Sequence, residues 1–190
     1  MKDWILTRDN VFSEQECDEL INLYKPSSKF DGNDIKYYSF LELDPNKFKY
    51  DYKINYLLEE YVRQYPEAGK TASVWTMTTM RFKHFRPGES FYNWHSENSM
   101  TYPYRVLALQ IYLSNHNCGT EFSGYDKTIM SVKGSATLFP AYFTHTHKGH
   151  ICPEKKDRYI ITGYVNFVRK GEDEKKNFIY NINIRKIKFY

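Results

Sequence analysis

Two short stretches of the sequence carry closely spaced histidines, and one of them adds a carboxylate. His95-Ser96-Glu97 places a histidine and a glutamate two residues apart, so in an extended backbone both side chains point to the same side. His145-Thr146-His147 supplies two more histidines later in the chain. Two histidines and one carboxylate on one face of an octahedron leave three positions open, which is the arrangement of non-haem Fe(II) oxygenases.

Each of these residues also has a simpler interpretation. A lone histidine is more often a hydrogen-bonded surface residue than a ligand. A zinc site is the alternative for the second stretch, although no cysteine lies beside it, which favours iron. His145 and His147 alternate onto the same face of a strand, so direction alone leaves both open as the third ligand.

The N-terminal region is predicted to supply helices that support this site. Ser13-Glu14-Gln15-Glu16 has the spacing of a capping box and precedes a helical apolar pattern, which predicts a helix over 14–24. Asp44-Pro45 is a good pair for a helix start and predicts a second helix that ends at Pro66. The apolar face of that second helix comprises Ile54, Leu57, Leu58, Tyr61, Val62 and Tyr65.

From residue 71 the pattern changes to short runs of β-branched and aromatic residues separated by turn residues. These runs predict strands at 71–85, 104–113, 120–122, 128–132, 136–139, 143–147 and 159–168, with a further strand over 178–189. So many short strands in succession favour an antiparallel sandwich or jelly roll. At 190 residues we expect one domain, with a helical support region over 1–70, a jelly-roll core over 71–168 and a C-terminal strand extension over 169–190.

Composition narrows the class of protein. Aromatic residues reach 18%, which indicates a globular chain, and a net charge of +4 is well short of a nucleic-acid footprint. The cysteines are Cys17, Cys118 and Cys152; their odd number and wide spacing predict free thiols in a reducing compartment. No apolar run approaches the length of a membrane span, so we expect a cytoplasmic protein. The sequence is also rich in Lys, Asn, Ile and Tyr, which is typical of an AT-rich bacterial or viral genome.

Several separate motifs occur in the order known from one enzyme family. They are Phe85-Arg86-Pro87-Gly88, Trp94-His95-Ser96-Glu97, Ile111-Tyr112-Leu113, Gly119-Thr120-Glu121-Phe122, Leu138-Phe139-Pro140 and the stretch from Arg158 to Tyr164. In these motifs the chain from about 80 to 168 resembles the catalytic domain of the prolyl 4-hydroxylase-like 2-oxoglutarate and Fe(II)-dependent dioxygenases. Glu97 stands where that family usually has aspartate.

The resemblance implies a fold and a set of roles. The fold is α+β, with a double-stranded β-helix (jelly roll) core and the N-terminal helices packed on one sheet. His145 lies at the family's usual distance after Phe139-Pro140, whereas counting back from Arg158 favours His147 but crosses the loop 151–157, where insertions are tolerated. We therefore expect Fe(II) to be held by His95, Glu97 and His145, and 2-oxoglutarate to be bound by Arg158, Thr162 and Tyr112.

The implied activity is hydroxylation of a peptide residue, prolyl-type, or of a small molecule, with release of succinate and CO2. Fe(II), 2-oxoglutarate and O2 are the expected cofactor and cosubstrates, and ascorbate stays open as an additional cofactor. A non-catalytic, cupin-like metal-binding module is the alternative from another class. We expect no membrane partner and do not favour nucleic acid; the substrate and the oligomeric state stay open.

Overall fold

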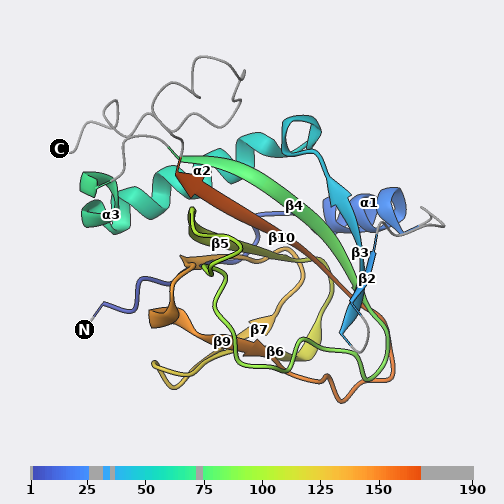
Figure 1. Ribbon diagram of the computed structural model, residues 1–190. Coiled ribbons are helices and arrows are strands. Elements are labelled where there is room, and N and C mark those ends of the chain that lie inside the picture. The colour runs from blue at the N-terminus through green and yellow to red at the C-terminus, as the bar shows by residue number, and fades with distance from the viewer. Residues whose placement is uncertain (1, 26–31, 35–36, 72–74, 168–190) are drawn as a thin grey trace.

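The computed structural model describes residues 2–25, 32–34, 37–71 and 75–167, which form two facing antiparallel sheets (Figure 1). The larger sheet has the strand order β1-β8-β5-β10-β4-β3-β2, and the smaller has the order β7-β6-β9. The larger sheet contains β1 (Leu6–Arg8), β2 (Gly32–Asp34), β3 (Tyr38–Leu43), β4 (Trp75–Phe85), β5 (Arg105–Tyr112), β8 (Ala136–Pro140) and β10 (Arg158–Phe167). The smaller contains β6 (His116–Phe122), β7 (Lys127–Ser131) and β9 (His147–Gly149). This arrangement confirms the predicted jelly-roll core.

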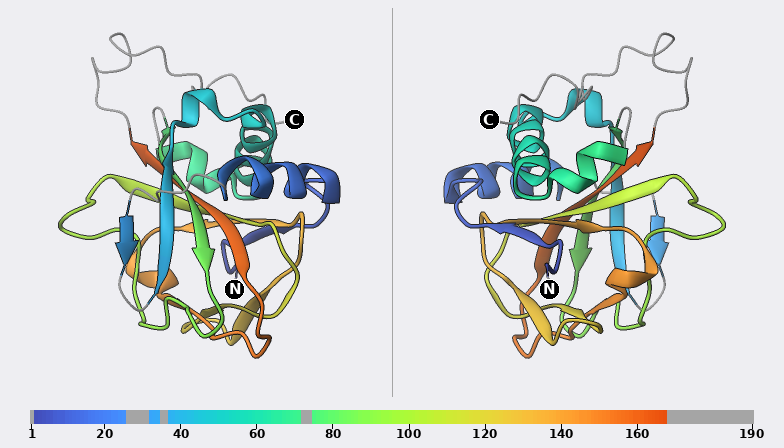
Figure 2. Two further views of the ribbon diagram at one scale, coloured as in Figure 1. Left: turned by 90° about the vertical axis from the view of Figure 1, so that its right-hand side faces the viewer. Right: turned by 90° about the vertical axis from the view of Figure 1, so that its left-hand side faces the viewer.

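Helices lie along the outer face of the larger sheet, on the side away from the smaller sheet (Figures 1 and 2). They are α1 (Glu14–Tyr24), α2 (Asp51–Gln64) and the short α3 (Pro66–Thr71). The apolar face predicted for the second helix is buried throughout, from Ile54 to Tyr65. Its start was predicted wrongly, because Asp44-Pro45 opens a separate 3-10 turn (η1, Pro45–Lys47) before α2 begins.

The predicted capping box at the start of α1 is confirmed. The Glu16 backbone N–H donates to Ser13 Oγ at 3.1 Å, and the Ser13 backbone N–H donates to Glu16 Oε2 at 2.7 Å. These two bonds satisfy donors that a helix N-terminus otherwise leaves without partners.

We expect Ser13→Ala to lower the free energy of unfolding by about 1 kcal/mol, because the N3 amide loses its acceptor. Urea denaturation followed by circular dichroism measures this change. Ser13→Asp is the matched control, since aspartate also caps helices and keeps most of the stability. Equal denaturation midpoints for Ser13→Ala and wild type would contradict the prediction.

Two apolar clusters hold these layers together. One lies between the helices and the outer face of the larger sheet, where Phe12 and Leu20 meet residues such as Trp75 and Phe82. The other lies between the two sheets and includes Tyr38, Phe85 and Tyr112 together with Phe122 and Phe139. Polar residues interrupt this second cluster on one side, and that interruption forms the cavity described below.

The described strands differ from the predicted ones at two places that matter. The N-terminal region supplies β1, β2 and β3 to the larger sheet, in addition to the predicted helices. The strand predicted over 143–147 was wrong: residues Phe143–His145 form a 3-10 turn (η2), and β9 begins only at His147. The strand predicted over 178–189 lies outside the described residues.

The prediction of three free thiols was also wrong. Cys118 on β6 and Cys152 in the loop before β10 form a disulfide, and Cys17 alone is free and buried. Linear spacing could not show this pairing, because the fold brings together residues that are 34 positions apart. Among the helices that the structure describes, none is both long and apolar enough to cross a membrane.

Candidate active site

A cavity of about 270 Å³ opens between the two sheets. Its walls come from residues of β3, β4, β5 and β10 in the larger sheet, of β6 and β9 in the smaller sheet, and of the segment 91–102. The lining is mixed: Phe85, Phe91 and Ile160 are apolar, whereas most of the remaining lining residues are polar or charged. An interior cavity that concentrates polar groups in this way is the expected place for chemistry.

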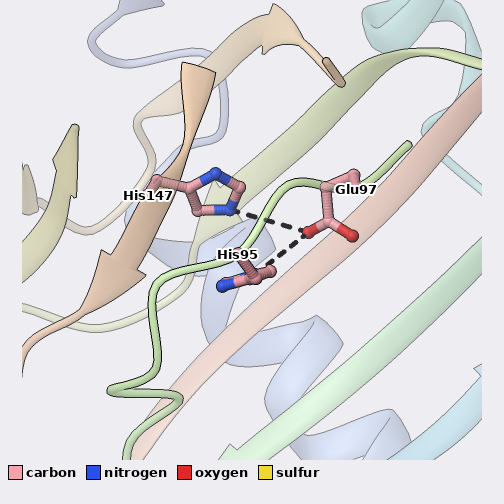
Figure 3. A group of neighbouring side chains, drawn as sticks. All are labelled: His95, Glu97 and His147. Atoms are coloured by element: carbon pink, nitrogen blue, oxygen red, sulfur yellow. Dashed lines mark ion pairs between the residues drawn. The ribbon is translucent and has the colours of Figure 1, made fainter. Parts of the chain in front are cut away.

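His95, Glu97 and His147 converge at one side of this cavity (Figure 3). Glu97 Oε1 lies 3.6 Å from His95 Nε2 and 3.6 Å from His147 Nε2. One ligand atom from each residue lies within 4.8 Å of the others. The expectation that His95 and Glu97 point to the same side is therefore confirmed, and the separation suits ligands around one cation.

Backbone carbonyls fix the orientation of both histidine rings. His95 Nδ1 donates to the carbonyl of Asn93 at 2.9 Å, and His147 Nδ1 donates to the carbonyl of His145 at 2.9 Å. A carbonyl only accepts, so each Nδ1 carries a proton and Nε2 is the nitrogen of each ring that a metal could use. His147 Nε2 is buried and makes no hydrogen bond within the described part of the chain.

The backbone fixes the two histidines opposite one another. The amide of His95 donates to the carbonyl of His147 at 3.0 Å, and the amide of His147 donates to the carbonyl of His95 at 2.9 Å. This two-bond antiparallel bridge sets the ring centroids 4.3 Å apart. The His147 ring also packs edge-on against Phe139, 4.8 Å away, so its orientation is fixed by the core.

Glu97 is held as an ionised carboxylate. Its Oε2 receives Arg105 Nη1 at 3.3 Å, which leaves Oε1 directed at the histidines. Burial alone would raise the pKa of Glu97, but His147, His95 and Lys83 hold that pKa well below its usual range. The Arg105 guanidinium is itself placed between the rings of Tyr102 and Tyr164, at 3.7 and 3.5 Å.

His145, the expected third ligand, does not join this group. Its Nε2 donates to the carbonyl of Asp3 at 2.7 Å, its Nδ1 bonds the hydroxyl of Thr144 at 3.0 Å, and its ring stacks on Tyr125. Burial lowers the pKa of His145, consistent with a neutral ring that fastens the N-terminal segment. The 3-10 turn takes up the residues counted from Pro140, so the histidine that lies beside His95 and Glu97 is His147, the position that counting back from Arg158 favours.

Arg158 and Thr162, both on β10, line the same cavity. The Arg158 guanidinium is buried against the ring of Phe85 at 4.3 Å, and Nη1 donates to Cys118 Sγ at 3.3 Å. Its Nε and the hydroxyl of Thr162 are buried without a hydrogen-bond partner among the described residues. Burial lowers the pKa of Arg158 to about 10, so the side chain stays cationic at neutral pH.

Tyr112 also faces the cavity, but its hydroxyl is already engaged. It donates to Gln110 Oε1 at 2.7 Å and lies 3.3 Å from the hydroxyl of Thr120. Burial raises the pKa of Tyr112 to about 12, so the phenol keeps its proton. Gln110 and Thr120 therefore also line the cavity with polar groups, and no sequence motif pointed to them.

Arg81, Lys83 and Arg105 are charged residues of the site that sequence reasoning missed. Lys83 is two residues before Phe85 on β4, and Arg105 begins β5. Period-two alternation from Phe85 places Lys83 and then Arg81 on the cavity face, so it could have identified these two, but it gives no signal for Arg105. The surrounding aromatics Tyr92, Trp94 and Phe143 are exposed, whereas Tyr142 is half-buried.

The donor set fits a divalent metal beside an anion. Three buried polar atoms without hydrogen-bond partners, His147 Nε2, Arg158 Nε and Thr162 Oγ1, belong to residues that line this one cavity. Buried polar groups are normally satisfied, so such a concentration indicates partners that the chain itself does not supply.

Comparison with known proteins agrees at the level of fold. No family model matches the sequence, and no curated protein matches it. The structure is similar to a viral collagen prolyl hydroxylase from Paramecium bursaria Chlorella virus-1 solved with 2OG, at 18% identity and a TM-score of 0.68 over 87% of this chain and 97% of that one. It is also similar to a Pseudomonas putida prolyl-4-hydroxylase, at 11% identity and a TM-score of 0.66 over 88% of this chain and 95% of that one. A core of two facing sheets, with the His95–Glu97–His147 cluster between them, thus gives this chain the fold of the prolyl 4-hydroxylases.

Proposed function

We propose that this protein is a 2-oxoglutarate and Fe(II)-dependent oxygenase that hydroxylates its substrate. The observation that carries the proposal is the pairing, in one cavity, of an open-faced two-histidine, one-carboxylate cluster with a buried arginine that has no carboxylate partner among the described residues. The viral structural neighbour was solved with 2OG, which supports the same ligand here.

His95, Glu97 and His147 would hold the iron through Nε2, Oε1 and Nε2. The Arg158 fork and the Thr162 hydroxyl would bind the distal carboxylate of 2-oxoglutarate, since a planar guanidinium matches a planar anion. When bound, the iron supplies the oxidation: one oxygen atom of O2 enters succinate as 2-oxoglutarate loses CO2, and the other enters a C–H bond of the substrate.

The chain's own part is positioning and exclusion of water. The carbonyls of Asn93 and His145 fix the two imidazole tautomers, and Arg105 orients the Glu97 carboxylate. Phe85 and Ile160 line the wall beside Arg158, so the anion would be held in surroundings that strengthen its charge-assisted bonds.

A non-catalytic, cupin-like metal-binding module is the competing function. Such a module needs the three ligands, but it has no use for a second, buried cation such as Arg158 in the same cavity. An arginine buried without a carboxylate partner is costly, so its placement favours a bound dicarboxylate.

Anaerobic titration of the Fe(II)-loaded protein with 2-oxoglutarate tests the proposal. We expect a metal-to-ligand charge-transfer absorption that saturates at one equivalent, followed by succinate formation when O2 is admitted. Pools of peptides and of small metabolites then identify the substrate as the pool that raises succinate formation. An Fe(II)-loaded protein that shows neither the absorption band nor succinate would favour the module instead.

A further inference from the structure

Lys83 is a buried lysine in the cavity wall with no role in the proposed iron or 2-oxoglutarate sites. It lies on β4, opposite Ile160 of β10 and Phe40 of β3, and is only 8% exposed. Its ammonium lies 4.4 Å from the centroid of the Tyr38 ring. A lysine is almost never this buried unless its charge is paired.

The described acids nearest this lysine are already paired with other cations, although Glu97 still favours its charge from a distance. Arg81 pairs with Glu42 at 2.7 Å, and Arg105 pairs with Glu97 at 3.3 Å. Within the described residues, neither Lys83 nor Arg158 has a carboxylate within ion-pair distance. The distal carboxylate of 2-oxoglutarate would neutralise only one of these two cations.

The two cations lie at different places along the wall. Arg158 is opposite Phe85, near the Cys118 end of the cavity, whereas Lys83 is two residues further along β4. Lys83 lines the same cavity as the proposed metal ligands His95, Glu97 and His147. An anion at Lys83 would therefore lie beside the reacting centre and apart from the Arg158 anchor.

We propose that Lys83 binds a carboxylate of the substrate, so that the preferred substrate is a small molecule with a free carboxylate, such as an amino acid. This inference rests on the proposed function and specifies its substrate class. An ammonium–carboxylate contact is a charge-assisted hydrogen bond, strengthened in a buried site. A residue inside a polypeptide has no carboxylate at the backbone and would leave the lysine without an ion pair.

The experiment measures succinate formed by the Fe(II)-loaded full-length protein with 2-oxoglutarate and O2. The probes are a pool of free L-amino acids and a matched pool of the same amino acids as C-terminal amides. We expect the free acids to stimulate turnover at least about tenfold more than the amides, as loss of one charge-assisted bond implies. Lys83→Met should abolish this preference, and Lys83→Arg should restore much of it.

The 2-oxoglutarate charge-transfer titration is run on each variant, which also shows that the site is folded. The inference is wrong if amides or internal peptides stimulate turnover as well as free acids do, or if neither pool stimulates it. It is also wrong if Lys83→Met weakens 2-oxoglutarate binding as much as Arg158→Met does, because Lys83 would then belong to the cosubstrate. A wild-type protein without the absorption band and without succinate would instead refute the proposed function.

Discussion

Replacing His147 with alanine is expected to remove iron from the protein and abolish succinate formation, whereas His145→Ala keeps the iron. The loss of affinity in His147→Ala should exceed about 100-fold, since even losing a residue that only supports a ligand costs roughly 10–100-fold. His147 Nε2 faces Glu97, whereas both nitrogens of the His145 ring are occupied by Asp3 and Thr144. Iron content after anaerobic loading, measured by elemental analysis, gives the result.

His145→Ala is the matched control, because it removes a neighbouring histidine from the same segment. It should unfold at lower urea concentration than wild type, since the Asp3 carbonyl loses its donor, and yet bind one iron. Iron lost from His145→Ala and retained in His147→Ala would reverse the assignment of the third ligand.

The second large effect is expected at Arg158. Arg158→Met should weaken 2-oxoglutarate binding by about 100-fold, because charge-assisted bonds contribute roughly 1.5–3 kcal/mol each and 1.4 kcal/mol is tenfold. Arg158→Lys keeps the charge and loses the fork, so we expect an intermediate loss of about tenfold. Both variants should retain iron. The charge-transfer titration checks this, because the band requires bound iron, and its saturation gives the dissociation constant of 2-oxoglutarate.

Arg81→Gln serves as the control for Arg158, because Arg81 lines the same cavity but already pairs with Glu42. Its 2-oxoglutarate affinity should stay close to that of wild type. Unchanged affinity in both Arg158 variants would place the anchor on another cation, and Lys83 would be the first to test.

Local patterns in the sequence predicted the parts of the fold that local physics decides. The capping box before α1 and the buried face of α2 follow from spacing within one or two helical turns. The same holds for His95 and Glu97, because an extended backbone sends residues two apart to the same side. Arg158 and Thr162, by contrast, were expected from the family resemblance; they lie four residues apart on β10 and line the same cavity.

The predictions from sequence failed where contacts between distant parts of the chain determine the local structure. The segment 143–147 has residues that suit a strand, yet residues Phe143–His145 form a 3-10 turn that lets His145 bond the carbonyl of Asp3. As a result, the histidine that lies beside Glu97 is His147, two residues after the expected His145. The Cys118–Cys152 disulfide and the strand β1 depend on distant partners, so no window of sequence around them could reveal them.

The antiparallel bridge between His95 and His147 would link loading of the proposed iron to folding. The two residues lie at the ends of a chain segment that contains β5 to β8, so a metal bound between them would act as a removable cross-link that closes this loop. Because the unfolded chain does not hold the ligands together, the metal would stabilise only the folded form, by roughly 2.7 kcal/mol at a hundredfold excess over its dissociation constant. Metal supply in the cell would then set how much of this protein persists, as well as how much of it is active.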